Sequence, residues 1–148
     1  MKTHVLTTSR YFLKSHPRAG EPTNFVGKVY EGSKIHTIRG NYEYWEKRIN
    51  EVNAGMALLS LRRWSGSPYN YLKDGSKQME YAQRFAGQCG IQKAEFNGFD
   101  VTIDGVLHPN FIDVLAKNDG LSREDFLDWF RDTPKEPMAI IQLTNFKY

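Results

Sequence analysis

The stretch from Phe99 to Asp104 constrains the fold most strongly, because apolar and polar residues alternate along it. A period of two is typical of a strand that buries one face and exposes the other. Asp104-Gly105 follows directly, and Asp-Gly is a frequent turn sequence in tight β-hairpins because both residues tolerate positive φ. We therefore expect a half-buried strand that enters a tight turn.

The remaining segments mix strand-like and helix-like patterns along a chain of 148 residues. β-favouring runs predict strands at residues 4–9, 57–62, 78–85 and 138–143. Amphipathic spacing predicts helices at residues 25–30, 42–54, 109–119 and 123–130. With 40% hydrophobic and 25% charged residues, the composition fits one globular domain, residues 1–148, and excludes a disordered or collagen-like chain. The order of segments predicts an α+β domain built around a mostly antiparallel sheet or barrel.

The ends of three of these helices carry recognisable capping residues. Asn24 and Ser122 are favourable N-caps, and Pro109 suits the first position of a helix. Gly32 and Gly120 suit the position just after a helix, where a positive φ is common. The capping residues therefore predict where these helices begin or end.

Residue usage excludes several classes of site. The single cysteine, Cys89, excludes an internal disulfide and any zinc site with two or more thiolates. The four histidines show no metal-ligand spacing and the chain has no Walker loop, so we expect neither a metal nor a cofactor. No run approaches the roughly 18 apolar residues of a membrane span, and residues 1–14 lack the pattern of a secretory signal. We therefore expect a cytoplasmic protein without membrane contact.

The formal net charge of +3 is unevenly distributed along the chain. Residues 1–94 carry 15 basic and 7 acidic residues, whereas residues 95–148 carry 5 basic and 10 acidic ones. Clustered Lys and Arg favour polyanions, because they displace counterions from phosphates. The alternative is that the basic and acidic parts attract each other within one fold.

The most informative motif is the run of residues 32–40, Gly-Ser-Lys-Ile-His-Thr-Ile-Arg-Gly. In an extended segment, Thr37 and Arg39 point to one face while Lys34 and His36 point to the other. All four side chains reach one site only if the segment bends. The alternative is a surface loop that carries ordinary solvated charges.

Four residues of this run match the pattern G-x-K-x-x-T-x-R, which resembles the signature of the ASCH family, the activating signal cointegrator homology domains related to PUA domains. The matching residues are Gly32, Lys34, Thr37 and Arg39. The order of strands and helices is similar in outline over most of the chain. The resemblance implies a small, mostly antiparallel PUA-like β-barrel flanked by helices, with a cleft that faces RNA or a modified nucleoside.

Some members of this family are amidohydrolases that remove the acetyl group from N4-acetylcytidine with a lysine, a threonine and a glutamate. The resemblance places the lysine at Lys34 and the threonine at Thr37, and the best match for the acid is Asp119. A threonine hydroxyl needs a neighbouring base to become a nucleophile, and a lysine of lowered pKa is such a base. The implied enzyme has Thr37 as nucleophile, Lys34 as base and Asp119 as the acid or orienting group.

A second cluster of basic and aromatic residues begins at Arg62. Cations that contact phosphates and rings that stack on bases are typical of single-stranded nucleic-acid binding. The alternative for the tryptophan of this cluster is a place in the core. Together with the motif, the cluster predicts nucleic-acid contacts for Lys34, His36, Arg39, Arg62, Arg63, Trp64 and Tyr69.

Three hypotheses about function follow. The first is an ASCH-type domain that binds RNA or a nucleoside in a basic cleft. The second is a metal-independent amidohydrolase that acts on acylated pyrimidine nucleosides. The third is a protein-interaction domain.

Overall fold

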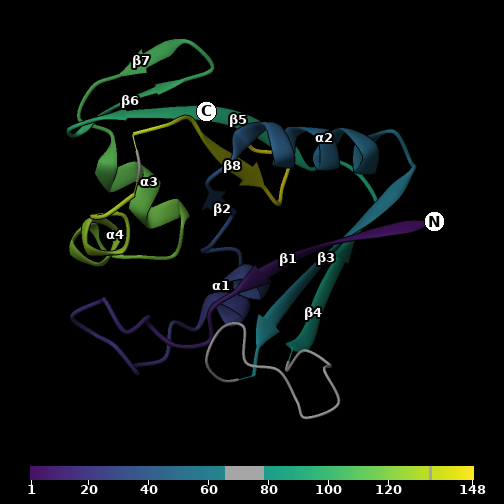
Figure 1. The fold of residues 1–148 in the computed structure, drawn as a ribbon, viewed down its shortest axis with the longest axis horizontal. Helices are drawn as coiled ribbons and strands as arrows, with labels where there is room; N and C mark the ends of the chain where they lie inside the picture. Colours follow the sequence, from purple (N-terminus) through teal and green to yellow (C-terminus); the bar gives the residue numbers. More distant parts are fainter. Residues whose placement is uncertain (66–78, 134) are drawn as a thin grey trace.

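The computed structural model of the chain describes residues 1–65, 79–133 and 135–148, which form four helices and eight strands (Figure 1). In chain order the elements are β1 (Lys2–Thr8), α1 (Phe25–Glu31), β2 (His36–Arg39), α2 (Tyr42–Asn53), β3 (Ala57–Trp64), β4 (Met79–Phe85), β5 (Gly90–Asn97), β6 (Asp100–Ile103), β7 (Val106–His108), α3 (Ile112–Asn118), α4 (Arg123–Trp129) and β8 (Met138–Gln142).

The strands form two sheets. One sheet has the order β1-β3-β4, with β1 parallel to β3, and the other has the order β2-β8-β5-β6-β7 with antiparallel neighbours throughout. The parallel pair follows from the long connection between β1 and β3, which contains α1, β2 and α2. The expected α+β class with mostly antiparallel pairing is confirmed. Within the described ranges, however, no ladder joins the two sheets into a closed barrel.

Strand β8 lies in the interior of the molecule, and all five of its residues are buried. Met138 and Ile140 belong to the core cluster that includes α3 and α4, whereas Ala139 and Ile141 belong to the cluster with α2 and the three-stranded sheet. Figure 1 shows α3 and α4 on one side of the five-stranded sheet and α2 beside β5 and β8. A strand buried on both faces needs a continuous apolar run, which is why this strand is evident in the sequence.

Three strands of the larger sheet, β2, β5 and β7, were not among the strands expected from the sequence. The segment of β2 was considered only as part of a motif that is either extended or a surface loop. The inward positions of β5 are occupied by Gly90, Gln92 and Ala94, so its alternation of buried and exposed residues is not an alternation of hydropathy. Strand β7 has only three residues and its two apolar side chains are exposed. It pairs with β6 through the predicted Asp104-Gly105 turn, where both residues have positive φ.

The structure confirms the predicted role of three of the five residues expected at helix ends. Gly32 and Gly120 follow their helices with φ of 85° and 79°, and the Ser122 side chain accepts a hydrogen bond from the backbone of Asp125 at 3.1 Å. Asn24 precedes α1, but its side chain makes no capping bond.

The prediction for Pro109 was wrong, because α3 begins three residues later, at Ile112. Hydrogen bonds hold the intervening residues to the start of β6: Asn110 N donates to Asp100 Oδ1 at 2.8 Å and Phe111 N donates to Phe99 O at 2.9 Å. Pro109 therefore lies in the turn before the helix.

Candidate functional site

A cavity of about 240 Å³ lies between the end of β1, the segment 34–39 and the end of α4. We call it the signature cleft, because Lys34, Thr37 and Arg39 line it together with Asp119. Its other walls include four aromatic side chains, from Phe25, Trp64, Trp129 and Phe130. The cleft therefore combines a polar side with four rings from three different parts of the chain.

The bend that this arrangement requires lies at Lys34 and Ile35. Thr37 and Arg39 are in register with Ile141 and Ala139 of β8 and share one face of β2. Lys34 does not continue this ladder but forms an isolated antiparallel bridge with Asp119. Ile35 then donates its N–H to Asn118 O at 2.9 Å and accepts from Leu143 N at 2.9 Å, which carries the chain from the end of α3 to β8. Lys34 thus reaches the cleft that Thr37 and Arg39 line.

Lys34 and Asp119 form a buried ion pair at the cleft. Lys34 Nζ donates to Asp119 Oδ1 at 2.9 Å and to Asp119 O at 2.8 Å, and the two residues are only 3% and 4% exposed. Burial lowers the pKa of the Lys34 ammonium, and the neighbouring Asp119 charge opposes this shift. Burial raises the pKa of Asp119, but Lys34 and His36 together bring it below its usual value. The carboxylate is therefore ionised, and the lysine is a more acidic ammonium than one in water.

Close packing fixes the position of the Lys34 side chain. A Cβ atom at Gly120 would lie 3.2 Å from Lys34 Cβ, so only glycine allows this close approach without displacement, and its φ of 79° also favours glycine. Lys34 Nζ lies 4.4 Å from the centroid of the Phe25 ring, at the distance of a cation–π contact. Both hydrogen bonds of Lys34 Nζ go to Asp119, so within the described ranges none goes to the Thr37 hydroxyl.

Arg39 connects the two sheets at the edge of the cleft. Its guanidinium donates to Ile38 O at 3.0 Å and to Thr7 O at the end of β1. The residue is partly buried. Arg39 therefore holds the wall of the cleft through backbone carbonyls.

His36 lies on the opposite face of β2 from Thr37 and Arg39, and it does not line the cleft. It is completely buried, with Nδ1 3.3 Å from Asp119 Oδ1 and Nε2 2.5 Å from the Tyr148 hydroxyl. The structure thus places His36 behind the ion pair instead of on a ligand-facing surface. Tyr148 was not singled out in the sequence, where no local pattern connects it with residues 34–39.

The basic and aromatic cluster separates in the structure. Trp64 is 3% exposed and lines the signature cleft. Arg62 and Arg63 do not line it: Arg62 Nε donates to Ser60 Oγ at 3.1 Å, and Arg63 pairs with Glu80 on β4. Tyr69 lies outside the described residues.

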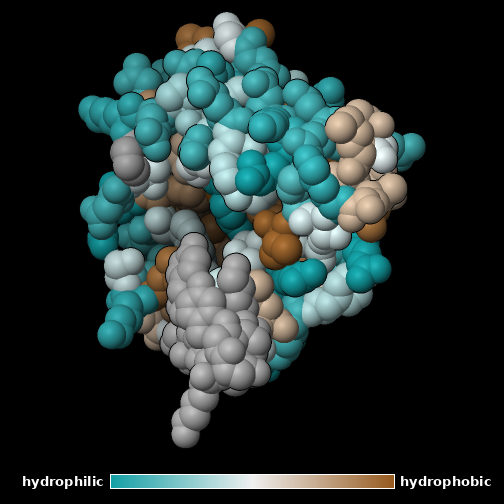
Figure 2. Space-filling model, turned by 45° about the vertical axis from the view of Figure 1, so that its right-hand side comes forward, coloured by the Kyte–Doolittle hydropathy of each residue, from teal (hydrophilic) through white to brown (hydrophobic). Residues whose placement is uncertain are grey.

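Most of the face shown in Figure 2 is hydrophilic, with hydrophobic residues in small separate patches.

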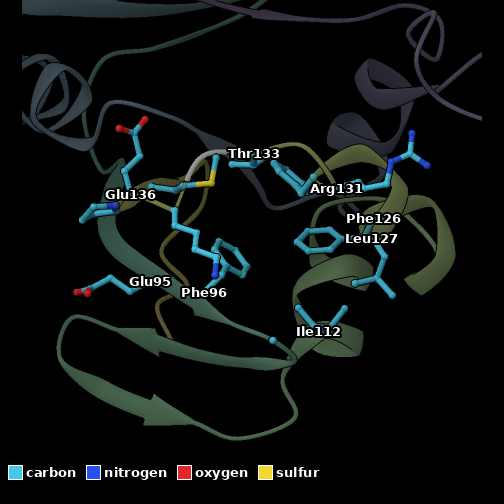
Figure 3. A pocket seen from close by; sticks show the side chains of 13 residues that line it. Glu95, Phe96, Ile112, Phe126, Leu127, Arg131, Thr133 and Glu136 are labelled. Carbon is cyan, nitrogen blue, oxygen red and sulfur yellow. The ribbon is translucent and has the colours of Figure 1, made fainter.

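A second cavity, of about 400 Å³, lies on the other side of Phe130, which lines both cavities. Figure 3 shows Phe96 of β5 opposite Ile112, Phe126 and Leu127 of α3 and α4. The charged residues of this cavity are exposed: Glu95, Arg131, Lys135 and Glu136. Unlike the signature cleft, this cavity presents no buried charged group to a ligand among the described residues that line it.

No protein-family model, curated protein or solved structure matches the chain. In the part of the chain that the structure describes, no group of three or more His, Cys, Asp or Glu side chains is arranged to hold a metal ion. None of the described helices is both long and apolar enough to cross a membrane. The geometry of the signature cleft is therefore the basis for a functional assignment.

Proposed function

We propose that the chain is an ASCH-type, PUA-like domain that binds a nucleoside, free or within RNA, in the signature cleft. The observation that carries this proposal is that Lys34, Thr37 and Arg39 line one cleft together with Asp119 and four aromatic rings. These three residues belong to the G-x-K-x-x-T-x-R pattern.

The chemistry of the cleft suits a heteroaromatic ring. Aromatic side chains stack on any base, because every base has a π-face, and polar groups then read its edge. Phe25, Trp64, Trp129 and Phe130 supply the rings, while Lys34 and Asp119 supply a donor and an acceptor. Binding sites with apolar walls and a few convergent polar groups are typical of small-molecule sites.

The dimensions of the cleft favour a single nucleoside over an RNA backbone. Its volume of about 240 Å³ is below the roughly 300–1,000 Å³ of sites for drug-sized ligands. Lys34 is buried against Asp119, and Arg39 donates to backbone carbonyls, so these cations are not arranged along an exposed phosphate track. When the nucleoside is part of RNA, we expect one base to enter the cleft and the phosphates to remain outside it.

Tryptophan fluorescence tests this proposal, because Trp64 and Trp129 line the cleft whereas Trp45 lies in the core. We expect cytidine and N4-acetylcytidine to quench the emission with saturation, and ribose, which has no aromatic ring to stack, to have no such effect. Replacing Trp129 by phenylalanine should remove part of this signal. A folded protein whose emission does not respond to any nucleoside or single-stranded RNA would reject the proposal and favour a protein-interaction domain.

A second candidate function is amide hydrolysis, because the three implied catalytic residues all line the cleft. Burial lowers the pKa of Lys34, which is the direction that a base requires. In the proposed step, the neutral amine form of Lys34 takes the proton of Thr37 Oγ as this oxygen attacks the acyl carbon. Lys34 then gives the proton to the amide nitrogen, the bond between this nitrogen and the acyl carbon breaks, and the nucleoside leaves with a free amino group. Water hydrolyses the threonine ester, which releases the carboxylic acid and regenerates the hydroxyl.

Hydrolysis is tested by incubating the chelator-treated protein with N4-acetylcytidine and measuring cytidine by chromatography. Thr37→Val should abolish turnover, because valine has the shape of threonine without the hydroxyl. Thr3→Val is the matched control, since Thr3 is exposed at the far end of β1. Saturable binding without turnover would leave the binding function and reject the enzyme.

A further inference from the structure

A buried polar network lies behind the signature cleft, on the face of the five-stranded sheet that packs against α3. Gln142 Nε2 donates to Gln92 Oε1 at 3.1 Å, and Gln92 also binds the backbone of Tyr148, through Tyr148 N at 3.0 Å and Tyr148 O at 3.1 Å. The Tyr148 hydroxyl then contacts His36, and His36 contacts Asp119. The network therefore ends at the carboxylate that holds Lys34.

The absence of a side chain at Gly90 leaves the space that this network occupies. Gly90 faces Gln142 across the β5–β8 ladder, and a Cβ atom at Gly90 would lie 2.9 Å from Gln142 Cβ. Glycine is therefore required for Gln142 to occupy its place beside Gln92. Because Gln92 holds both backbone groups of Tyr148, the position of the tyrosine ring is determined by the sheet.

The donors and acceptors of the network define the proton positions. Asn118 Nδ2 donates to the Tyr148 hydroxyl at 3.0 Å, which leaves the phenolic proton for His36 Nε2. Burial raises the pKa of Tyr148, so the phenol keeps this proton. Ionised Asp119 only accepts hydrogen bonds, so His36 Nδ1 is the nitrogen that carries hydrogen.

We propose that His36 is a positioning residue of the signature cleft: as the neutral tautomer protonated at Nδ1, it holds Asp119 Oδ1 and limits the attraction of this oxygen for Lys34. This inference rests on the proposed function, because it concerns how the ion pair of that site is adjusted. His36 and Lys34 share the same carboxylate oxygen. A carboxylate oxygen that already accepts a hydrogen bond is less basic, so it holds the Lys34 proton less strongly.

The groups around Lys34, Asp119 and His36 include two further positive charges, and both affect the pKa of Lys34. Arg39, which lines the cleft, and Lys28 of α1 lower the pKa of Lys34 further, because they are like charges. The described contacts of His36 are the neutral phenol of Tyr148 and the ionised carboxylate of Asp119. Because Nε2 accepts the phenolic proton of Tyr148, it carries no hydrogen of its own, and the ring is the neutral tautomer with hydrogen on Nδ1.

The tautomer is measured directly by ¹⁵N NMR of histidine-labelled protein without any ligand. We expect His36 to show a protonated Nδ1 and a bare Nε2 at neutral pH. A spectrum in which His36 carries its proton on Nε2, or on both nitrogens, would overturn the inference.

Two variants separate positioning from mere structure. Asparagine at position 36 places its amide near the Nδ1 position and keeps a donor for Asp119, whereas glutamine reaches the Nε2 position and keeps only the Tyr148 contact. We expect H36Q to move the titration midpoint of Lys34, followed by the ¹³Cε shift of labelled lysine, to higher pH. H36N should leave the midpoint near the wild-type value, although both variants lose the same ring.

Equal Lys34 midpoints in H36Q, H36N and the wild type would overturn the inference even if both variants are less stable. His4→Asn is the control, since His4 lies on β1 and contacts the carboxylate of Glu51, which does not belong to the network. These measurements use the free protein, so their failure is distinct from a failure to bind nucleosides, which the fluorescence titration of the wild type detects.

Discussion

Asp119→Asn should destabilise the protein strongly, because it leaves the buried Lys34 ammonium without its counterion. Asparagine keeps the shape of the side chain and one carbonyl acceptor, and the bond from Lys34 Nζ to the backbone carbonyl remains. Removing one partner of a buried ion pair typically costs about 3–5 kcal/mol. The cationic side chains of Arg39 and Lys28 add to this loss, since both disfavour the protonated lysine.

Deprotonation of Lys34 sets an upper limit on this loss. The ordinary pKa of the lysine is 10.5. Releasing its proton at pH 7 therefore costs about 5 kcal/mol, at about 1.4 kcal/mol for each pH unit. A lysine whose pKa is lowered in the folded state binds fewer protons there than in the unfolded chain, so the free energy of unfolding rises with pH. The deficit of D119N should therefore shrink to about 2 kcal/mol at pH 9.

Urea denaturation at pH 7 and pH 9, followed by far-ultraviolet circular dichroism, measures both quantities. Asp113→Asn is the matched control: Asp113 is a 70% exposed aspartate of the adjacent helix, paired with Arg123, and should cost less than about 1 kcal/mol. Adding Lys34→Met to D119N should restore stability, because the uncompensated charge is then absent. A loss below about 1 kcal/mol for D119N, or the same loss at both pH values, would refute the reasoning.

Three further predictions concern the framework of the site. Gly90→Ala should lower the free energy of unfolding by about 1–3 kcal/mol in urea denaturation, because the added Cβ atom overlaps the Gln142 side chain. Gly27→Ala is the control and should be neutral or stabilising, because no atom lies within 4 Å of the Cβ position at Gly27. Equal effects of the two substitutions would contradict the prediction. Ser122→Ala should cost about 1 kcal/mol in the same assay through loss of the N-cap of α4, and an unchanged midpoint would contradict the capping role. Burial raises the pKa of Cys89 to about 11, so its alkylation by iodoacetamide should be slow at pH 8 and should accelerate as the pH approaches that value; rapid alkylation at pH 8 would contradict this.

The sequence was most informative where one local pattern coincides with one structural environment. The run that forms β8 is apolar at nearly every position because both faces are buried, and Trp45 and Ile49 of α2 repeat at helical spacing because one face is buried. The turn at Asp104-Gly105 and the Ser122 cap are backbone requirements that particular residue types satisfy locally. Such features need no knowledge of distant parts of the chain.

Strand β5 and the start of α3 were hidden because their determinants are not local. Gln92 is buried in β5 because Gln142 and Tyr148 satisfy its amide, and a polar residue with distant partners cannot be distinguished in sequence from an exposed one. Pro109 is a suitable first helical residue by itself, but hydrogen bonds from the next residues to the start of β6 place it in a turn.

Lys34, Thr37, Arg39 and Asp119 were identified from the sequence alone. The alternation of side chains along a strand also indicated that a bend is needed to bring residues of both strand faces to one site. Only the tertiary structure decided which side chains the bend unites. The bridge between Lys34 and Asp119 turns the lysine into the cleft, while His36 remains behind it with Tyr148. The physical reason is that residues 85 and 112 positions apart meet only when the sheets and helices have packed, whereas the alternation of side chains along a strand is fixed by adjacent residues.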